Sequence, residues 1–523
     1  MGSSSGKSAE DGLDEVREKV ATRIGKVAVT GRYHTTKTLK DDYIVDEKDI
    51  LGVGYNGAVY KARSKNDPNN LVAVKDFQLR GVDEEKMAEL QGECEIFLGM
   101  DHPHVARLTD VYQDKYKLSL VMEMMYGGEL FDRIIEKKKF TEKDSADAAY
   151  QMLLALGYLH SHGVVHRDVK LENFLYESKD GDHLKLIDFG FSKIWDASTK
   201  MKLSCGTLSY VSPEVLGKAY TNKCDMWSIG VVCFILMCGY MPFSGGESKQ
   251  IKDIREGKFA RKEAFDKLSK DAADFLCNLI KVDADARMSA DEALKHRFIV
   301  GRSERAMKES EVGDDTVQNL LDFSKASKFR RACMTCMAWS LTNDQRIQLR
   351  EDFLAMDKNK HGTITLGEFK SIIQERYAGQ FSDSQVKELF DAIDTSHTEE
   401  IAYTEFLAAM MMNRMALHDD ILKATFRRFD TNGSGVIEPK DLEVLLGESF
   451  EGEEVKDLIK EADTNGDGRI DYDEFLAFAK KQAASDSQHK IVDIGHKIID
   501  KEASKDKNTS SWPIHLPQFR MFG

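Results

Sequence analysis

A short stretch in the first half of the chain carries the residue types that phosphoryl transfer requires. Asp168 is followed by Lys170 and Asn173, and a second acidic residue, Asp188, comes fifteen residues after Asn173. A carboxylate can accept the proton of an attacking hydroxyl, and a lysine can neutralise charge on the transferring group. The side-chain oxygens of Asn and Asp can hold a divalent cation. The order and spacing of these residues therefore indicate a site that transfers phosphoryl groups to hydroxyls.

A glycine-rich segment lies upstream, between two strand-like patterns. Gly52, Gly54 and Gly57 have the spacing that lets backbone N–H groups close over phosphates without interference from Cβ atoms. The same spacing occurs in dinucleotide-binding folds, where a helix opens at the third glycine. Here strand-like residues follow instead, at Val59 and again over residues 71–75. The segment therefore predicts a strand, a turn and a strand that cover the phosphates of a nucleotide.

Together these segments resemble the eukaryotic protein kinase family over roughly residues 43–298. The resemblance implies a two-lobed fold that binds ATP and Mg²⁺ and transfers the γ-phosphate to a protein hydroxyl. It implies that Met122 guards the back of the nucleotide pocket and that backbone groups of Glu123 and Met125 bind the purine edge. The residues that it assigns to the nucleotide are Gly52, Gly54, Gly57, Val59, Ala73, Lys75, Met122, Glu123 and Met125.

The same resemblance makes Lys75 the lysine that pairs with phosphates, and it gives Lys75 a carboxylate partner on a predicted helix over residues 84–100. Glu89, Glu93 and Glu95 compete for this role. Glu93 is preferred because apolar residues follow it as they do at the end of the corresponding helix in the family. A generic surface ion pair is the alternative for each of the three.

Within the catalytic stretch, the resemblance makes Asp168 the group that orients the substrate hydroxyl and accepts its proton. Lys170 would neutralise the transferring charge, and Asn173 with Asp188 would hold Mg²⁺. A lysine at the position of Lys170 is the family's mark of serine/threonine rather than tyrosine specificity, and Thr207 agrees with it. We therefore expect a serine/threonine protein kinase.

The resemblance also predicts two supporting contacts and one departure from the common pattern. Glu214 should pair with Arg287, and Asp225 should anchor the backbone of the catalytic loop. Leu203 occupies the position where many kinases carry an activating phosphothreonine. We therefore expect control of activity to come from elsewhere in the chain.

Four twelve-residue loops, each between helical patterns, follow in the second half of the chain. They begin at Asp357, Asp394, Asp430 and Asp463, and each has an apolar residue at its eighth position. The series resembles two pairs of EF-hands and implies Ca²⁺ binding by oxygen ligands. The predicted ligands are Asp357, Asn359, His361, Thr363 and Glu368 in the first loop, Asp430, Asn432, Ser434, Val436 and Asp441 in the third, and Asp463, Asn465, Asp467, Arg469 and Glu474 in the fourth.

The four hands are not equivalent. The fourth has a full set of hard oxygen ligands closed by Glu474, and we expect it to bind Ca²⁺ most tightly. The third closes with the shorter Asp441, and the first has His361 where an oxygen ligand is expected, so both should bind more weakly. The second has Glu399 where glycine permits the sharp turn, which predicts a structural hand without Ca²⁺.

A basic amphipathic segment, residues 320–341, joins the two halves. Phe329 and Trp339 fall near one helical face, and Arg330 and Arg331 supply positive charge beside an acidic neighbour. Such a helix is the usual target of an opened EF-hand groove. We expect it to inhibit the kinase at rest and to be released by Ca²⁺-loaded hands. A packed linker helix is the alternative.

A sharper hypothesis concerns the substrate groove. Glu129 and Glu172 lie where kinases that prefer basic substrates hold arginines upstream of the phosphorylated residue, which predicts substrates of the Arg-x-x-Ser/Thr kind. Ordinary solvated glutamates are the alternative. The run from Arg330 to Cys333 reads like such a substrate with a thiol in place of the hydroxyl, so its arginines would meet the two glutamates in the resting state.

Composition agrees with a cytoplasmic protein that does not bind nucleic acids. The apolar content of 41% and charged content of 31% are those of ordinary globular proteins, and no run of about eighteen uncharged apolar residues occurs. The formal net charge of −15 argues against a nucleic-acid-binding surface. The eight scattered cysteines indicate reduced thiols. Gly2 leaves peripheral membrane attachment by lipidation open, although position six lacks the Ser or Thr of a myristoylation signal.

Kinase, amphipathic junction and four EF-hands in this order resemble the calcium-dependent protein kinases of plants and protists. The predicted fold class is α+β, a two-lobed kinase followed by an all-α EF-hand domain, and the predicted protein is a monomer that phosphorylates proteins in response to Ca²⁺. Two alternatives remain, a calcium-sensing pseudokinase scaffold and a constitutively active kinase whose hands serve only localisation. The predicted divisions are a flexible N-terminal extension (1–42), the kinase domain (43–299), the autoinhibitory junction (300–342), the EF-hand domain (343–480) and a C-terminal tail (481–523).

Overall fold

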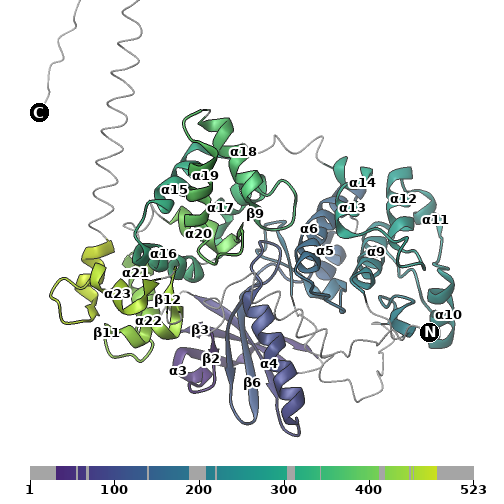
Figure 1. Ribbon diagram of the computed structural model, residues 1–523. Helices are drawn as coiled ribbons and strands as arrows, with labels where there is room; N and C mark the ends of the chain where they lie inside the picture. The colour runs from purple at the N-terminus through teal and green to yellow at the C-terminus, as the bar shows by residue number, and fades with distance from the viewer. Residues whose placement is uncertain are drawn as a thin grey trace, which may run out of the picture.

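The chain folds into a two-lobed kinase domain and a helical calcium module that lies beside it (Figure 1). The computed structural model describes residues 31–54, 57–65, 70–137, 140–187, 208–217, 221–302, 312–341, 343–377, 379–411, 419–446, 449–451 and 453–479. The predictions for Asp188, Leu203, Thr207 and residues 481–523 fall outside these residues. We call residues 312–479, as far as they are described, the calcium module. The mixed α+β fold class predicted from the sequence is confirmed.

The small lobe is a six-stranded sheet with one long helix. The strand order is β1-β5-β6-β4-β3-β2, and all neighbours are antiparallel except β1 and β5. The β-branched and aromatic residues that alternate along these segments favour strands, and the helix α4 is capped by the side chain of Asp83. The elements are β1 (Tyr33–His34), α3 (Leu39–Asp42), β2 (Tyr43–Gly54), β3 (Gly57–Ser64), β4 (Leu71–Gln78), α4 (Glu84–Gly99), β5 (Leu108–Gln113) and β6 (Lys117–Glu123).

Residues 31–42 belong to the small lobe, whereas the sequence analysis placed them in a flexible extension. The strand β1 adds to the edge of the sheet at β5, and the Arg32 guanidinium is buried and donates to the carbonyl oxygens of Leu98 and Leu108. The Tyr43 hydroxyl donates to Asp110 on β5, 2.7 Å away. These contacts join distant parts of the chain, so no local pattern in residues 31–42 could reveal them.

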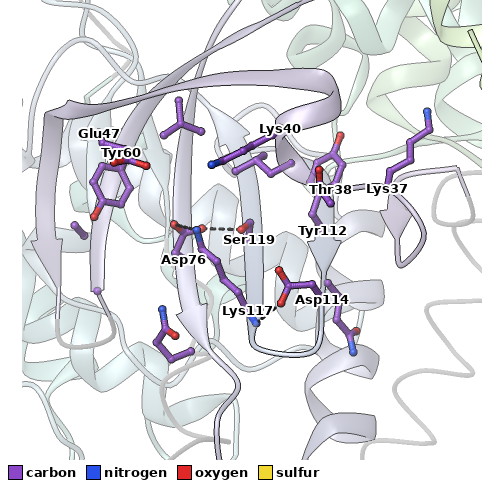
Figure 2. Close-up of a pocket in the computed structure, with 16 residues that line it drawn as sticks. Lys37, Thr38, Lys40, Glu47, Tyr60, Asp76, Tyr112, Asp114, Lys117 and Ser119 are labelled. Atoms are coloured by element: carbon purple, nitrogen blue, oxygen red, sulfur yellow. Dashed lines mark hydrogen bonds and ion pairs between the residues drawn. The ribbon is translucent and has the colours of Figure 1, made fainter.

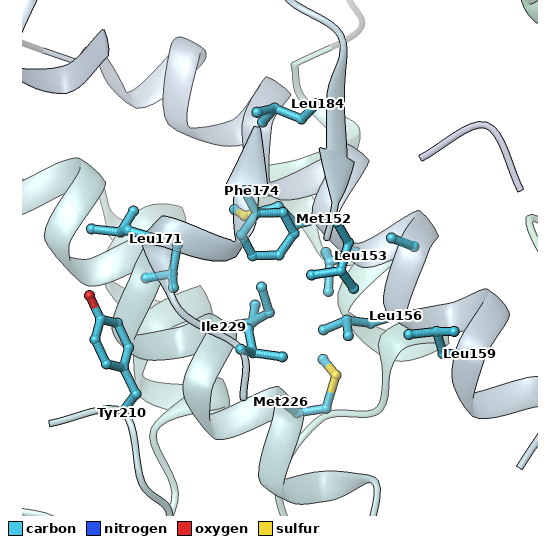
Figure 3. Packing of buried hydrophobic residues seen from close by; sticks show 14 of the residues in the cluster. Met152, Leu153, Leu156, Leu159, Leu171, Phe174, Leu184, Tyr210, Met226 and Ile229 are labelled. Atoms are coloured by element: carbon cyan, nitrogen blue, oxygen red, sulfur yellow. The ribbon is translucent and has the colours of Figure 1, made fainter. Parts of the chain in front are cut away.

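The large lobe is helical and packs around two long helices. α6 begins at a capping box formed by Thr141 and Asp144, and α9 ends at Gly239, whose φ of 76° suits a residue without a Cβ. Figure 3 shows side chains of α6, such as Leu156, against Met226 and Ile229 of α9. The elements are α5 (Leu130–Lys137), α6 (Glu142–Ser161), η1 (Leu171–Asn173), β7 (Phe174–Tyr176), β8 (Leu184–Leu186), η2 (Val215–Gly217), α9 (Lys223–Cys238), α10 (Glu247–Glu256), α11 (Glu263–Asp266), α12 (Lys270–Leu279), α13 (Ala290–Leu294) and α14 (Arg297–Val300).

The calcium module contains two pairs of hands. Short antiparallel strands join the loops within each pair, β9 with β10 in the first pair and β11 with β14 in the second. The helices are α15 (Asp314–Ser324), α16 (Lys328–Ser340), α17 (Asn343–Met356), α18 (Leu366–Arg376), α19 (Asp383–Ile393), α20 (Tyr403–Met410), α21 (Asp419–Phe429), α22 (Pro439–Leu446), α23 (Val455–Leu458) and η5 (Ile459–Glu461), and the strands are β9 (Ile364–Thr365), β10 (Glu400–Ile401), β11 (Val436–Ile437), β12 (Ser449–Phe450), β13 (Glu453–Glu454) and β14 (Ile470–Asp471). None of the helices in the described part of the chain combines the length and the apolar character needed to cross a membrane.

The junction consists of two helices, α15 and α16, and both are part of the core of the calcium module. Phe329, Cys333, Met334 and Met337 of α16 are fully buried in the same hydrophobic cluster as the EF-hand helices. α16 packs against α20 of the first pair and α21 of the second. It therefore lies between the two pairs of hands, as Figure 1 shows.

Candidate functional site

The catalytic loop brings the predicted residues Asp168, Lys170 and Asn173 together. The Lys170 ammonium group lies 2.7 Å from the Asp168 carboxylate, and the Asn173 amide nitrogen donates to the Asp168 carbonyl at 2.7 Å and to its carboxylate at 3.2 Å. Because the nitrogen of the Asn173 amide is used in this way, the amide oxygen remains for another partner. The arrangement fixes the Asp168 carboxylate beside a positive charge, where a hydroxyl substrate can approach it.

Asp225 on α9 holds the backbone of this loop, as predicted. Its carboxylate accepts the backbone N–H groups of His166 and Arg167 at 2.9 and 2.8 Å, and the His160 ring lies 2.9 Å away. Arg167 has a φ of 66°, a conformation that costs a residue with a Cβ about 1 kcal/mol or more. Burial opposes ionisation of Asp225, but the hydrogen bonds from its partners, with that from His160 first, keep its pKa below the ordinary value.

A second predicted contact also supports the large lobe. Arg287, which is fully buried, donates to both carboxylate oxygens of Glu214 at 2.7 and 3.0 Å. Two parallel hydrogen bonds between charged groups are strong and fix the relative orientation of the two planes. The pair therefore ties the end of the activation segment to the loop before α13.

The residues assigned to the nucleotide are neighbours in the small-lobe sheet. Val59 pairs with Lys75 across β3 and β4, and Ala73 pairs with Met122 across β4 and β6. Ala73 and Lys75 lie two positions apart on one strand, so they face the same side of the sheet. At the turn after β2, Gly54 pairs with Gly57, and Gly57 has a φ of 136°. Lys75 is buried, and Glu93 lies on α4 as expected.

Glu123 has a second set of contacts that the sequence analysis missed. The backbone N–H of Glu123 donates to the carbonyl oxygen of Arg107. The backbone group of Glu123 that can contact a purine is therefore its carbonyl oxygen. Its buried carboxylate lies 2.9 Å from Lys185 of β8 and 3.1 Å from Arg346 of α17. Burial raises the pKa of Glu123, but the charges of Lys185 and Arg346 outweigh this effect and lower the pKa to about 2. The calcium module therefore contacts the strand that leads to the nucleotide pocket.

A cavity of about 650 Å³ lies on the other side of the small-lobe sheet (Figure 2), and of the residues predicted to bind the nucleotide it is lined by Gly57 alone. It is lined by Asp76 and Ser119, whose side chains hydrogen-bond at 2.7 Å, and by Lys117, which pairs with Asp76. Asp76 follows Lys75 on β4, so the two side chains face opposite sides of the sheet. The catalytic residues are absent from this lining.

The fourth and third calcium loops have the backbone geometry that a bound cation requires. Gly468 and Gly435, at the sixth position of each loop, have φ values of 83° and 87°. In the fourth loop the Glu474 carboxylate accepts backbone N–H groups of Thr464 and Asn465 at 3.0 and 3.1 Å, which holds it over the start of the loop. In the third loop Asp441 has the corresponding contact with Thr431. These loops fit an oxygen-ligated cation.

The first calcium loop packs against the kinase domain. A Cβ on Gly362 would lie 2.5 Å from His102 and 2.6 Å from Tyr158, and the His361 ring lies 3.7 Å from Asp291 of α13. Burial raises the pKa of Asp357, the first residue of the loop, to about 6. The first loop therefore combines a candidate cation site with a contact to the large lobe.

The second loop keeps the EF-hand backbone path despite the missing glycine. Glu399 has a φ of 65°, and its backbone N–H donates to the Asp394 carboxylate at 2.8 Å. Burial, together with the charge of Asp394, raises the pKa of Glu405 to about 7. The loop thus has the strain that the sequence predicted at its sixth position.

We expect Glu399→Gly to stabilise the calcium module by about 1 kcal/mol, because glycine adopts this φ without a steric penalty. The matched change is Gly435→Ala at the same position of the third loop, which should destabilise the module by about 1 kcal/mol. Chemical denaturation of both variants without Ca²⁺ checks the pair of values. Destabilisation by both substitutions would show that the second loop is not strained at Glu399.

The hypothesis that Arg330 and Arg331 meet Glu129 and Glu172 in the resting state stays a prediction, because α16 lies in the calcium module in this structure. Arg331 pairs there with Glu451 of the calcium module through two hydrogen bonds, one of them 2.9 Å long, and Cys333 is buried. The apolar face of α16, which contains Phe329, is buried in the calcium module. This packing places Arg331 of the same helix beside Glu451. Burial, then the charges of Asp132 and Glu172, raise the pKa of Glu129, which marks an acidic patch near the catalytic loop.

Comparison with known proteins assigns both halves of the chain. Residues 45–299 match the protein kinase domain, and residues 346–411 and 419–480 match the EF-hand domain pair. The chain is 34% identical over 446 residues to calcium-dependent protein kinase 5 of Plasmodium falciparum (isolate 3D7), covering 84% of this chain and 78% of the relative. It is 32% identical to calcium-dependent protein kinase 3 of Plasmodium berghei (strain Anka), over 85% of this chain and 81% of the relative. It is 31% identical to calcium-dependent protein kinase 3 of Oryza sativa subsp. japonica, over 84% of this chain and 81% of the relative.

These relatives span both the catalytic and the calcium-binding half, and the match extends well beyond the short motifs. Nothing in them favours a pseudokinase. The chain belongs to the calcium-dependent protein kinases and is a calcium-activated serine/threonine protein kinase.

Proposed function

We propose that Asp168, Lys170 and Asn173 carry the transfer of the ATP γ-phosphate to Ser and Thr hydroxyls. Asp168 orients the substrate hydroxyl and accepts its proton, and Lys170 neutralises charge on the transferring group. The distance of 2.7 Å between the Lys170 ammonium group and the Asp168 carboxylate supports these paired roles. Asp225 is a positioning residue, since it holds the backbone of the loop and not the substrate.

Nucleotide binding is assigned to the small-lobe sheet and the hinge. Lys75, with Glu93 as its partner, would hold the phosphates under the turn that contains Gly52, Gly54 and Gly57. Met122 would close the back of the pocket, and the Glu123 carbonyl and the backbone of Met125 would bind the purine edge. Asn173 and Asp188 would hold Mg²⁺ through oxygen atoms, and the bound cation would neutralise developing charge on the phosphates. The amide oxygen of Asn173 fits this role, because the amide nitrogen donates to Asp168.

Ca²⁺ binding is assigned to the first, third and fourth loops with the ligands given above. The left-handed glycines and the carboxylate at position twelve of the third and fourth loops support this assignment. The order of affinity should follow the ligand sets, with the fourth loop tightest.

Regulation is assigned to an exchange of α16 between two partners. In the structure α16 fills the core between the two pairs of hands, and Phe329 packs against Phe429 and Phe478 at ring distances of 6.1 and 5.3 Å. This buried position is the observation that carries the proposal, because a helix held there cannot occupy the kinase domain. We infer that α16 contacts the substrate side of the kinase when the hands lack Ca²⁺ and moves into the module when Ca²⁺ opens them.

A photo-crosslinking experiment tests this exchange. The photoreactive residue p-benzoylphenylalanine replaces Phe131, which is exposed on α5 next to the catalytic-loop turn η1. Crosslinks from this position to peptides of residues 320–341 are expected with a chelator and should disappear with Ca²⁺. The same residue in place of the equally exposed Val282, in the loop after α12, is the matched control. Absence of such crosslinks in the chelator would refute inhibition by α16 at the groove.

Three finer assignments complete the proposal. The acidic patch of Glu129, Asp132 and Glu172 supports a preference for arginine upstream of the phosphorylated residue. We also propose a monomeric, cytoplasmic enzyme, with peripheral membrane attachment as an open alternative. Comparison of Arg-Arg-x-Ser and Ala-Ala-x-Ser peptides tests the arginine preference directly.

A further inference from the structure

The helix α20 of the second hand lacks a capping side chain of its own. The helices α18 and α19 begin at Thr365 and Ser382, whose hydroxyl groups accept a backbone N–H in the first turn. The residue at the same position before α20 is Ala402, which has no oxygen to offer. Thr365 and Ser382 accept the third N–H of their helices, from Glu368 and Gln385, so the N–H of α20 that Ala402 leaves uncapped is that of Glu405.

The kinase domain supplies an acceptor for the preceding N–H of the same turn. The backbone N–H of Thr404 donates to the Asp101 carboxylate, which lies in the loop between α4 and β5. A carboxylate at the N-terminus of a helix also interacts favourably with the helix dipole. Asp101 is itself fixed, because its backbone N–H donates to the Tyr158 hydroxyl at 2.9 Å. A residue 303 positions away thus acts as the N-terminal cap of α20.

Arg107 of the kinase domain extends the same contact. Its guanidinium donates to Asp101 at 3.1 Å, to the Thr404 hydroxyl at 3.2 Å and to the Ala338 carbonyl of α16 at 3.4 Å. It also lies over the Trp339 ring, 4.6 Å from its centroid, and Arg32 lies 3.9 Å from the same centroid. One side chain therefore contacts the kinase, the second hand and the junction helix.

These polar groups are buried only where the two modules meet. Asp101, Arg107 and Thr404 are 7%, 4% and 4% exposed. Buried charges cost free energy unless each is paired and hydrogen-bonded, so the contact tolerates little change in geometry. Separation of the modules would leave the first turn of α20 without its acceptor, and α20 is also the helix that packs on α16.

We propose that the second hand is a docking hand, whose helix α20 is capped by Asp101 of the kinase domain. The Thr404 N–H in the first turn of α20 then has the Asp101 carboxylate as its acceptor only when the calcium module is docked on the kinase domain. Because Arg107 also binds the end of α16, the kinase recognises the module with α16 in place. This role is independent of whether α16 inhibits the kinase, and it explains a hand that keeps its fold despite an unsuitable sixth residue.

Hydrogen exchange of the full chain in Ca²⁺, without ATP or substrate, tests the proposal. Asp101→Ala should make the amides at residues 404–406 exchange about tenfold faster, the effect expected for loss of an N-terminal cap. Asp101→Asn, which keeps the shape and one acceptor oxygen, should give a smaller increase. Asp180→Ala, an exposed acid of the kinase domain, is the control and should change nothing. Unchanged exchange at Thr404 in both Asp101 variants would overturn the proposal.

A rescue variant separates capping from docking. Ala402→Ser in the Asp101→Ala background gives α20 a cap of its own, so exchange at residues 404–406 should slow again. The radius of gyration from X-ray scattering should stay near that of the wild type, because Arg346 with Glu123 and Arg350 with Glu177 also join the modules, so the change in exchange reports the cap and not separation. Failure of the Ala402→Ser substitution to slow the exchange would show that Asp101 does not act as a cap. The autoinhibition proposal is untouched by either result, since neither measurement involves activity.

Discussion

Asp168→Asn is expected to lower kcat for peptide phosphorylation by about 10²- to 10⁴-fold. The asparagine amide has nearly the same shape as the carboxylate, but it cannot accept the proton of the substrate hydroxyl. The substitution also removes the negative charge that lies 2.7 Å from the Lys170 ammonium group, so Lys170 loses its ion pair. Steady-state phosphorylation of an Arg-Arg-x-Ser peptide with saturating Ca²⁺ provides the measurement.

The fold and the nucleotide pocket should survive this change. Asp168 is held by Lys170 and Asn173, while the nucleotide residues lie on β3, β4 and β6, so the affinity for an ATP analogue should stay within about threefold. Asp180→Asn, at an exposed acid outside the site, is the matched control and should keep wild-type kcat. A kcat for Asp168→Asn within threefold of the wild type would remove Asp168 from the mechanism.

Phe329→Ala is expected to destabilise the calcium module by about 3–5 kcal/mol. The Phe329 ring is fully buried on α16 between Phe429 of the third hand and Phe478 of the fourth. Its removal leaves a cavity where α16 joins the second pair of hands. Because this packing holds α16 in the module, the Ca²⁺ concentration for half-maximal activity should also rise.

Two measurements check the Phe329 prediction. Denaturant unfolding with Ca²⁺ gives the loss of stability, and a Ca²⁺ titration of peptide phosphorylation gives the shift in activation. Val444→Ala in the same module is the control, since Val444 is 49% exposed and should change stability by less than about 0.5 kcal/mol. An equally small effect of Phe329→Ala would mean that α16 is not anchored at this ring.

The catalytic loop could be predicted from the sequence because its chemistry is local. Asp168, Lys170 and Asn173 lie within six residues, and the backbone just before Asp168 is held by one distant carboxylate, Asp225. The resemblance to kinases supplied that carboxylate and the pair of Glu214 with Arg287. The strain at Glu399 was likewise visible in the sequence, since the position within a calcium loop determines the backbone conformation.

The surface between the two modules could not be predicted in this way. Arg346 meets Glu123 across 223 positions of the chain, and Thr404 meets Arg107 across 297. Each of these residue types is ordinary on the surface of a helix or strand, so nothing local distinguishes a buried partner from a solvated one. The short strand β1 escaped detection for a similar reason, because two residues carry no periodicity.

The position of α16 in the structure has a physical reason. The basic residues and the apolar residues of this segment lie on two different faces of α16. The sequence alone does not indicate which face is buried against another part of the protein. In the structure the apolar face, with Phe329, is enclosed by the hands, and this places Arg331 against Glu451. The packing of α16 therefore determines the position of Arg331.

The central claim is that Ca²⁺ switches phosphoryl transfer on through the EF-hand module. The most direct test is transfer of phosphate from ATP and Mg²⁺ to an Arg-Arg-x-Ser peptide by the full chain, with Ca²⁺ and with a chelator, and with Asp168→Asn as the blank. The account predicts activity above the blank with Ca²⁺ and activity near the blank with the chelator. Equal activity in both conditions would contradict it.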